Sequence, residues 1–232
     1  PGPFTTGNGL TFGRDGDLYA CDHRLGAVLR ITPDGTSSIY ASGWNGDSFH
    51  SPNDLAFDPN GNLYFSDTQS HHPDTLDGTV YKVMRYTGKV LPVVRNLAFP
   101  NGIALGPEAK HLYVSESAKM RVNRFQISEN GILDSLEQFV ATGRGEPDGL
   151  AFDRDGNLYV AVYGAGSVNV YSPAGKLVKK ILTPGSKPSN LEFGGPELRT
   201  LFLTEDETHR VYKIATDIPG FPLYYSPLRR TQ

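Results

Sequence analysis

Short apolar segments recur along the chain at intervals of 41 to 48 residues. Each begins with a polar or small dipeptide, usually after proline, and continues as Leu-Ala-Phe or a close variant. The five segments span residues 7–12, 52–57, 100–105, 147–152 and 188–193. A period of this length indicates a repeated supersecondary unit.

A second apolar segment follows each of these, mostly after a glycine-containing turn. The second segments span residues 18–20, 63–65, 112–114, 158–160 and 201–203. Three of the turns contain a dipeptide that favours tight hairpins, because its residues tolerate positive φ: Asp15-Gly16, Asn60-Gly61 and Asp155-Gly156. We therefore expect the first two segments of each repeat to pair as antiparallel strands.

Further strands complete each repeat. Third strands are expected at 27–31, 80–84, 122–127, 168–171 and 211–214, and fourth strands, less sharply marked, at 38–41, 90–94, 136–141 and 177–182. Four strands per period are typical of a β-propeller blade. The sequence predicts an all-β propeller of four-stranded blades, five of them visible, in one domain over residues 1–232. A β-sandwich is the alternative, and five matches in register disfavour it.

Composition narrows the function classes. The 22 basic and 25 acidic residues give a net charge of −3, which disfavours a nucleic-acid partner. The single cysteine, Cys21, excludes an internal disulfide and a cysteine-based zinc cluster. No apolar run approaches the roughly 18 residues of a membrane span. The compartment stays open, with the cytoplasm favoured.

The second position of the repeated first strand always bears a side-chain oxygen. The residues are Asn8, Asn53, Asn101, Asp148 and Ser189. First strands line the central channel of a propeller, so these side chains are expected to converge, and such oxygens suit a hard cation. Asp148 is the charged member and thus the candidate general base. A turn preference for Asn or Asp before Gly is the alternative explanation.

Several short motifs together resemble one family. Pro52-Asn53-Asp54-Leu55, Pro100-Asn101-Gly102, Pro147-Asp148-Gly149 and Phe193-Gly194-Gly195-Pro196 look like the SMP-30/gluconolactonase/luciferin-regenerating-enzyme-like family. The resemblance implies a six-bladed propeller with a divalent metal in its channel, and hydrolysis of lactones. It further implies Asn101 and Asp148 as metal ligands, Asp148 as catalytic residue, and Asn53 at the metal or substrate. Calcium is the favoured ion, with zinc, magnesium and manganese as alternatives.

The chain departs from the family at its start. The family's remaining metal ligand is a glutamate in a first-blade motif like Gly-Glu-Gly-Pro, which this sequence lacks. Six blades would need roughly 275 residues at this period. We therefore expect the chain to be truncated, without its first blade, and its own activity to be less secure than that of the family.

Other residues have weaker signals. Asp22, Asp67, Glu116 and Glu205 follow the second strands at one register, where turn capping is favoured, and Asp67 is the candidate substrate-binding member. His71-His72 lie in a long loop, His23-Arg24 follow Asp22, and Trp44 and Phe49 precede the Asn53 strand, where packing is at least as favoured as lining a pocket.

Two other functions remain open. Repeats of the type Pro-x-Gly-Leu-Ala-Phe also resemble non-catalytic NHL modules, which act as binding scaffolds. A strictosidine-synthase-like or paraoxonase-like enzyme would share the fold. No Gly-x-Ser-x-Gly elbow or nucleotide-binding glycine motif is present, so serine-hydrolase and nucleotide chemistry lack support. The favoured function is a metal-dependent hydrolase of small lactone-type esters.

Overall fold

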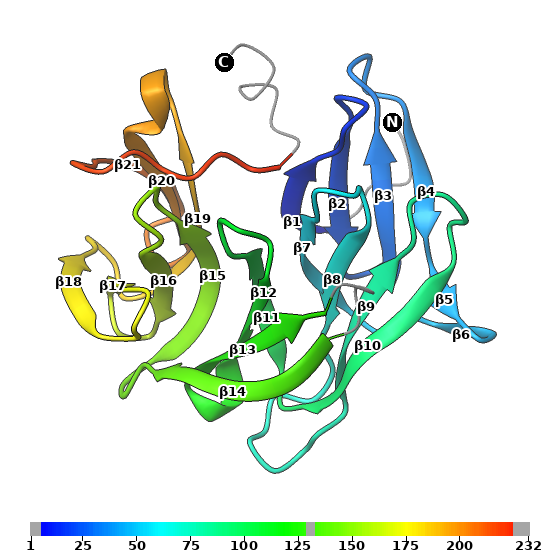
Figure 1. The fold of residues 1–232 in the computed structure, drawn as a ribbon, viewed down its shortest axis with the longest axis horizontal. Coiled ribbons are helices and arrows are strands. Elements are labelled where there is room, and N and C mark those ends of the chain that lie inside the picture. Colours follow the sequence, from blue (N-terminus) through cyan, green and yellow to red (C-terminus); the bar gives the residue numbers. More distant parts are fainter. Residues whose placement is uncertain (1–5, 129–132, 225–232) are drawn as a thin grey trace. The chain divides into compact units, whose positions relative to one another are not determined.

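The computed structural model describes residues 6–128 and 133–224, and strands dominate this part of the chain (Figure 1). The described residues form four four-stranded antiparallel sheets, one three-stranded sheet and one two-stranded hairpin. Each four-stranded sheet has strands in chain order, which is the arrangement of a propeller blade. The predicted strand pattern is therefore confirmed, including the last sheet, for which three strands are expected.

The chain divides into two compact units. Residues 6–103, with 223 and 224, belong to the first, and residues 104–128 and 133–222 to the second. The first unit contains β1 (Gly7–Phe12), β2 (Leu18–Asp22), β3 (Ala27–Ile31), β4 (Ser37–Ala41), β5 (Gly43–Trp44), β6 (Asp47–Ser48), β7 (Pro52–Phe57), β8 (Leu63–Asp67), β9 (Gly78–Val83) and β10 (Val90–Leu97). Strand β11 (Pro100–Leu105) begins in this unit.

The second unit contains three sheets. The first has β12 (His111–Glu116), the 3₁₀ turn η1 (Ser117–Lys119), β13 (Arg121–Ile127) and β14 (Leu133–Ala141), with β11 pairing on β12. The next consists of β15 (Glu146–Phe152), β16 (Leu158–Tyr163), β17 (Ser167–Tyr171) and β18 (Leu177–Leu182). The last consists of β19 (Pro188–Gly194), β20 (Thr200–Glu205) and β21 (Arg210–Ala215), with η2 (Pro196–Leu198) between its first two strands.

The hairpin turns between first and second strands follow the sequence signals. Gly16, Gly61 and Gly156 have φ of 90°, 86° and 78°. Each of these glycine N–H groups donates to the carbonyl three residues earlier, for example Gly61 to Asp58 at 2.9 Å. Glycine adopts this left-handed conformation without steric cost, which explains its place in the repeat.

Aromatic pairs join neighbouring sheets inside each unit. The tyrosine of one second strand meets the phenylalanine at or next to the end of the first strand of the next sheet, edge to face. The pairs are Tyr19–Phe57 at 4.9 Å in the first unit, and Tyr113–Phe152 and Tyr159–Phe193, both at 5.0 Å, in the second. These contacts belong to the hydrophobic cores of their units. The Leu-Tyr and Ala-Phe parts of the repeat therefore form the packing between blades.

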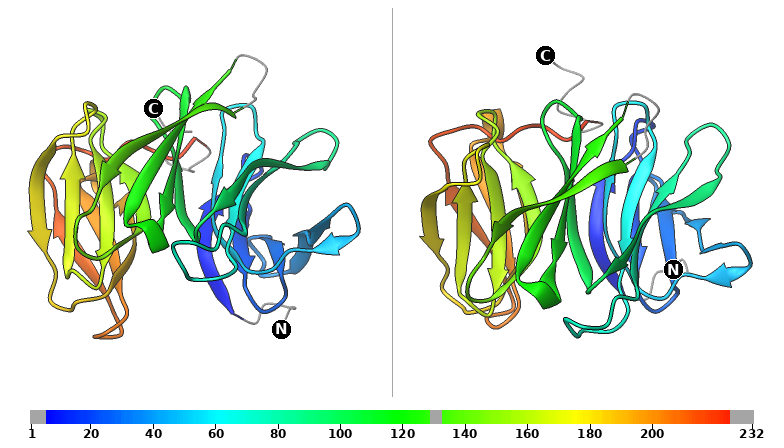
Figure 2. Two further views of the ribbon diagram at one scale, coloured as in Figure 1. Left: turned by 90° about the horizontal axis from the view of Figure 1, so that it is seen from below. Right: turned by 60° about the horizontal axis from the view of Figure 1, so that its bottom comes forward.

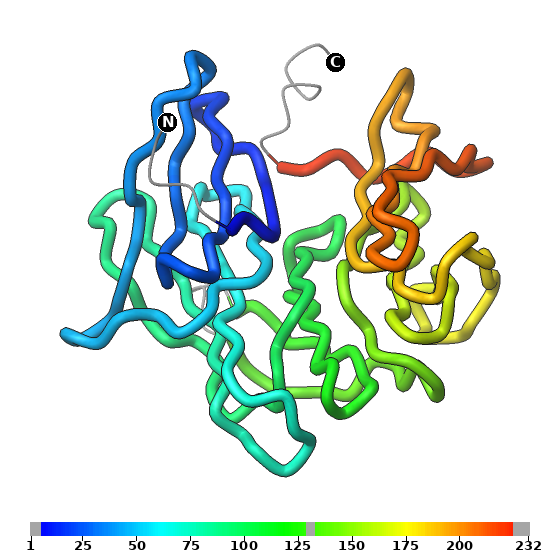
Figure 3. Tube along the Cα trace, turned by 180° about the vertical axis from the view of Figure 1, so that it is seen from behind, coloured from blue at the N-terminus to red at the C-terminus, as the bar shows by residue number. Residues whose placement is uncertain are grey.

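Two features of the first unit depart from the repeat. The β5–β6 hairpin projects from it (Figure 2), and the sequence pattern did not indicate these strands. The segment 68–77 between β8 and β9 has no regular structure and extends beyond the strand ends (Figure 3), as the predicted long loop requires.

Candidate functional site

Asn53 and Asn101 have unusual surroundings for amide side chains. They are the second residues of β7 and β11 and are only 7 % and 9 % exposed. Neither side-chain amide makes a hydrogen bond with any residue that the structure describes. Their amide atoms are not among the buried unpaired side-chain atoms of the described residues, so water, a cation or a ligand can reach them. The structure thus leaves the side-chain oxygens of both predicted residues available to a ligand.

A serine holds the two strands at matching register. Ser66 Oγ accepts a hydrogen bond from the Asp54 N–H at 3.1 Å and donates to the Asn101 carbonyl at 2.6 Å. The Asp54 carboxylate in turn accepts the Ile103 N–H at 3.1 Å. All of these groups belong to the first unit. Asn53 and Asn101 therefore occupy equivalent positions on strands that are bonded to each other at this point.

Asp148 has the same backbone support in the second unit. Ser115 Oγ donates to the Asp148 carbonyl at 2.7 Å, as Ser66 does to Asn101. Ser117 Oγ donates to the Pro147 carbonyl at 2.6 Å. Asp148 is half-buried. The register position that the sequence singled out is thus fixed by a repeated hydrogen bond.

Four of the first strands are bulged at this position. Pairing with the second strand shifts register between Gly7 and Leu10, Pro52 and Leu55, Pro147 and Leu150, and Pro188 and Leu191. A bulge leaves its residues outside the regular ladder and re-aims their side chains, and it is common beside active sites. In these four strands, the second position of the repeat therefore lies in a break of the regular pairing. The alternation of apolar and polar residues in the sequence did not indicate these bulges.

The turn explanation for the Asn-Gly and Asp-Gly dipeptides is wrong. Asn8-Gly9, Asn101-Gly102 and Asp148-Gly149 lie inside strands β1, β11 and β15. A Cβ on Gly9 would collide with Asp54, and one on Gly149 would collide with Asn190. Glycine is required because the first strands of neighbouring sheets approach closely here, as β1 and β7 do in Figure 1.

The other two residues at the second position of the repeat, Asn8 and Ser189, have hydrogen-bond partners within the protein. Asn8 Nδ2 lies 2.6 Å from His23 Nε2, and the other ring nitrogen of His23 is hydrogen-bonded to Ser51 Oγ. Burial lowers the pKa of His23, against the effect of nearby Asp22. In the second unit Ser189 Oγ bonds to Thr204 and Asp206, so its hydroxyl is already used.

Strand-end carboxylates act mainly as caps, as the sequence favoured. Asp67 accepts the backbone N–H groups of His50 at 3.1 Å and Ser51 at 2.6 Å. Burial raises the pKa of Asp67, while these two hydrogen bonds act in the opposite direction. Its carboxylate therefore holds the segment that leads into Asn53. Asp22 and Glu205 cap turns in the same way, whereas Glu116 binds the side chains of Arg121 and Asn123.

The residues flanking the Asn53 strand have packing contacts. Phe49 is 4 % exposed and packs on Phe65 and Tyr81 in the hydrophobic core. Trp44 is covered by the Arg95 guanidinium at 4.7 Å. In the long loop, His71 packs against Phe99. These contacts agree with the packing alternative.

The chemistry of the donors decides what ion they fit. Among residues 6–128 and 133–224, no three His, Cys, Asp or Glu side chains gather as a cation site. Amide oxygens are the other side-chain ligands that a hard cation accepts. Asn53 and Asn101 provide these, and their lack of protein partners fits that role. Neutral amide oxygens suit a hard cation such as Ca²⁺ better than zinc, which prefers nitrogen and sulfur.

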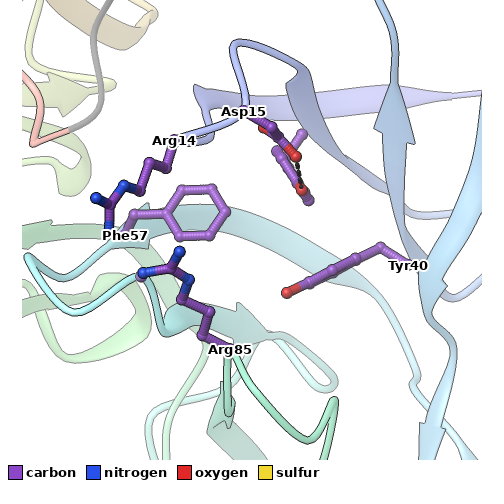
Figure 4. A pocket seen from close by; sticks show the side chains of 7 residues that line it. Arg14, Asp15, Tyr40, Phe57 and Arg85 are labelled. Carbon is purple, nitrogen blue, oxygen red and sulfur yellow. Dashed lines mark hydrogen bonds between the residues drawn. The ribbon is translucent and has the colours of Figure 1, made fainter.

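A cavity of about 350 Å³ lies at the other end of the first-unit strands (Figure 4). It is lined by Arg14, Asp15, Tyr19, Tyr40, Phe57, Gly61 and Arg85. These residues come from turns and strand ends of two blades, far from Asn53 along β7. Sequence reasoning did not identify this cavity.

Comparison with known proteins identifies a family that matches most of this chain. The family model of the SMP-30/gluconolactonase/LRE-like region matches residues 3–206. "Lactonase drp35" from Staphylococcus aureus (strain bovine RF122 / ET3-1) is 34 % identical over 188 residues, covering 74 % of this chain and 55 % of the relative. The chain thus spans about half the length of that protein.

Two solved structures show the fold. A gluconolactonase from Xanthomonas campestris is 27 % identical with a TM-score of 0.80, over 92 % of this chain and 72 % of that one. The calcium-binding protein regucalcin from Agrobacterium tumefaciens is 19 % identical with a TM-score of 0.70, over 96 % and 94 %, a likeness of fold alone. The predicted β-propeller class is confirmed. No helix among the described residues is long and apolar enough to cross a membrane. With most of its length matched by the family model, the chain belongs to the SMP-30/gluconolactonase/LRE-like family.

Proposed function

We propose that this chain contributes the site of a metal-dependent hydrolase of lactone-type esters. The observation that supports this most is the pair of amides of Asn53 and Asn101, which are 7 % and 9 % exposed and have no hydrogen-bond partner among the described residues, with Asn53 in a strand bulge. The lactonase and gluconolactonase among the relatives favour the same chemistry. In this proposal Asn53, Asn101 and Asp148 hold the cation, and calcium is the favoured ion.

The cation, when bound, supplies a Lewis acid that polarises an ester carbonyl. The protein residues supply position and a base. Asn53 and Asn101 present neutral oxygens on strands fixed by Ser66. The half-buried carboxylate of Asp148 accepts a proton from an attacking water, which requires it to remain ionised near neutral pH.

Asp67 contributes in this proposal by holding the substrate-facing segment in place. Both of its carboxylate oxygens accept backbone N–H groups ahead of β7. We therefore assign substrate contact to Asn53 and positioning of Asn53 to Asp67. Replacing Asp67 with asparagine would disturb one of the two N–H contacts and weaken substrate binding more than turnover.

Calorimetric titration of the metal-stripped chain tests the site without any guess about substrate. Calcium, then manganese, magnesium and zinc, are titrated into the unmodified chain, Asp148→Ala and Asn101→Ala. Asp155→Ala, which removes an exposed turn carboxylate in the same unit, is the matched control. We expect saturable calcium binding in the unmodified chain and the control, and its loss in the two site variants.

Hydrolysis of a sugar δ-lactone, γ-butyrolactone and an open-chain ester is then followed with and without the bound ion. Turnover of a lactone that needs both the ion and Asp148 is the expected result. Absence of cation binding in the unmodified chain would contradict the proposal and favour a non-catalytic binding scaffold. Cation binding without turnover of any lactone would contradict the hydrolase but keep the metal site.

A further inference from the structure

The cavity between the turn ends of the first two blades has a built cationic wall. The backbone N–H of Arg85 donates to Asn62 Oδ1 at 3.1 Å. The backbone N–H and Nδ2 of Asn62 in turn donate to the Asp58 carboxylate at 2.8 and 2.7 Å. The guanidinium Nη1 reaches the Asn60 carbonyl at 3.4 Å. A Cβ on Gly61, whose φ is 86°, would collide with the Arg85 stem. The Asp58–Asn62 turn therefore sets where the Arg85 side chain lies.

The charges around the cavity favour an anion. Arg14 and Arg85 both line it, and Asp15 is the carboxylate of the lining. Asp15 already accepts the Tyr19 hydroxyl at 2.9 Å and pairs with Arg30 at 3.1 Å. Arg30 also pairs with Asp17. Two guanidinium groups thus share the cavity with one carboxylate, which is already bonded to Tyr19 and Arg30, and planar guanidinium forks match carboxylate and phosphate oxygens.

The other walls are aromatic. Tyr19 packs edge to face on both Phe57 and Tyr40, with ring centroids 4.9 Å apart in each pair. Burial raises the pKa of Tyr40, and the Asp15 charge acts in the same direction, so the phenol keeps its proton. Figure 4 shows the Tyr40 hydroxyl and the Arg85 guanidinium directed into the space beside the Phe57 ring.

We propose that this cavity binds a small aromatic anion, a planar ring that bears a carboxylate or phosphate group. The ring packs on Phe57, the anionic group lies at Arg14 and Arg85, and Tyr40 donates a hydrogen bond to it. The volume of about 350 Å³ is in the range of small-ligand pockets. Asn53 is at the opposite end of β7, so this site is separate from the proposed hydrolase site.

Titration of phenyl phosphate and benzoate into the whole chain, followed by calorimetry and saturation-transfer NMR, tests the proposal. A chelator is present throughout, so the result does not depend on the cation site or on hydrolysis. Benzamide is the neutral probe of matched size, and inorganic phosphate lacks the ring. Both aromatic anions are expected to bind at least about tenfold more tightly than either of these, as expected for charge-assisted hydrogen bonds.

Variants locate the binding. Arg85→Gln is expected to weaken phenyl phosphate about tenfold, and Tyr40→Phe several-fold, while thermal unfolding checks that both fold. Arg154→Gln, an exposed arginine of the second unit, removes the same charge and should change nothing. Unchanged affinity in both cavity variants would overturn the site. Equal binding of benzamide would overturn the anionic requirement, and equal binding of inorganic phosphate the aromatic one.

Discussion

The two ends of strand β7 differ in chemistry although the whole strand is buried. At its start, Asn53 lies in a bulge with an unpaired amide. At its end, Phe57 lies in regular pairing with β8 and packs edge to face on Tyr19. At the strand start, the Asn53 amide has no hydrogen-bond partner among the described residues, which suits a ligand. At the strand end, the Phe57 ring is held by aromatic packing. Burial alone therefore does not separate a site from a core.

The largest expected effect is at the packed end. Phe57→Ala should lower the free energy of unfolding by about 3–5 kcal/mol, because it removes a buried ring from an aromatic cluster. Phe12 has the same repeat position on β1 but is 38 % exposed, so Phe12→Ala should cost much less. Urea unfolding of the two variants measures the difference. Equal losses would show that the two strand ends do not differ as described.

The serine at the other end gives the next largest effect. Ser66→Ala leaves the Asn101 carbonyl and the Asp54 N–H without their partner, which should cost about 1–3 kcal/mol. Ser38→Ala, at an exposed position of β4, is the control and should be close to neutral. Chemical unfolding gives the stability, and calcium titration should show weaker binding in Ser66→Ala only. Unaltered binding would mean that the serine does not position Asn101.

Acid tests the strand-end carboxylates as structural caps. Burial acts to raise the pKa of Glu205, but hydrogen bonds from Thr208, Lys187 and Glu207 outweigh it and hold the pKa below its usual value of 4.5. The stabilisation is complete above pH 4.5 and is lost as the pH falls through the lowered pKa. The stability gap between the unmodified chain and Glu205→Gln should therefore be larger at pH 7 than at pH 3.5.

Thermal unfolding at these two pH values measures that gap. Glu197→Gln, on a largely exposed side chain, is the control and should show little change with pH. A gap that widens toward acid would contradict the capping role of Glu205.

The smallest stability effect is expected at the start of β7. Asn53→Ala removes an amide that has no hydrogen-bond partner among the described residues, so unfolding should change by less than about 1 kcal/mol. Asn62→Ala, which removes the Nδ2 bond to Asp58 and the Oδ1 acceptor of the Arg85 backbone N–H, should cost more. Calcium titration should show the reverse order, with the larger loss in Asn53→Ala. A large loss of stability in Asn53→Ala would instead make this residue part of the scaffold.

The sequence by itself determined the strands and their pairing within each sheet. Alternating apolar segments, glycine turns and the fixed repeat are local signals, and antiparallel neighbours in a blade are consecutive in the chain. The same repeat placed Asn53, Asn101 and Asp148 at one register. It also indicated that the strand-end carboxylates cap turns, because Asp and Glu before a turn have backbone N–H groups within reach.

Only the tertiary structure decided how these residues are used. The bulges, the serine bonds to Asn101 and Asp148, and the close approach of Gly9 to Asp54 all depend on contacts between strands or between blades. The cavity that joins Arg14 to Arg85 depends on two turns from different blades meeting. Such contacts follow from sheet twist and packing, which no local pattern of apolar and polar residues encodes.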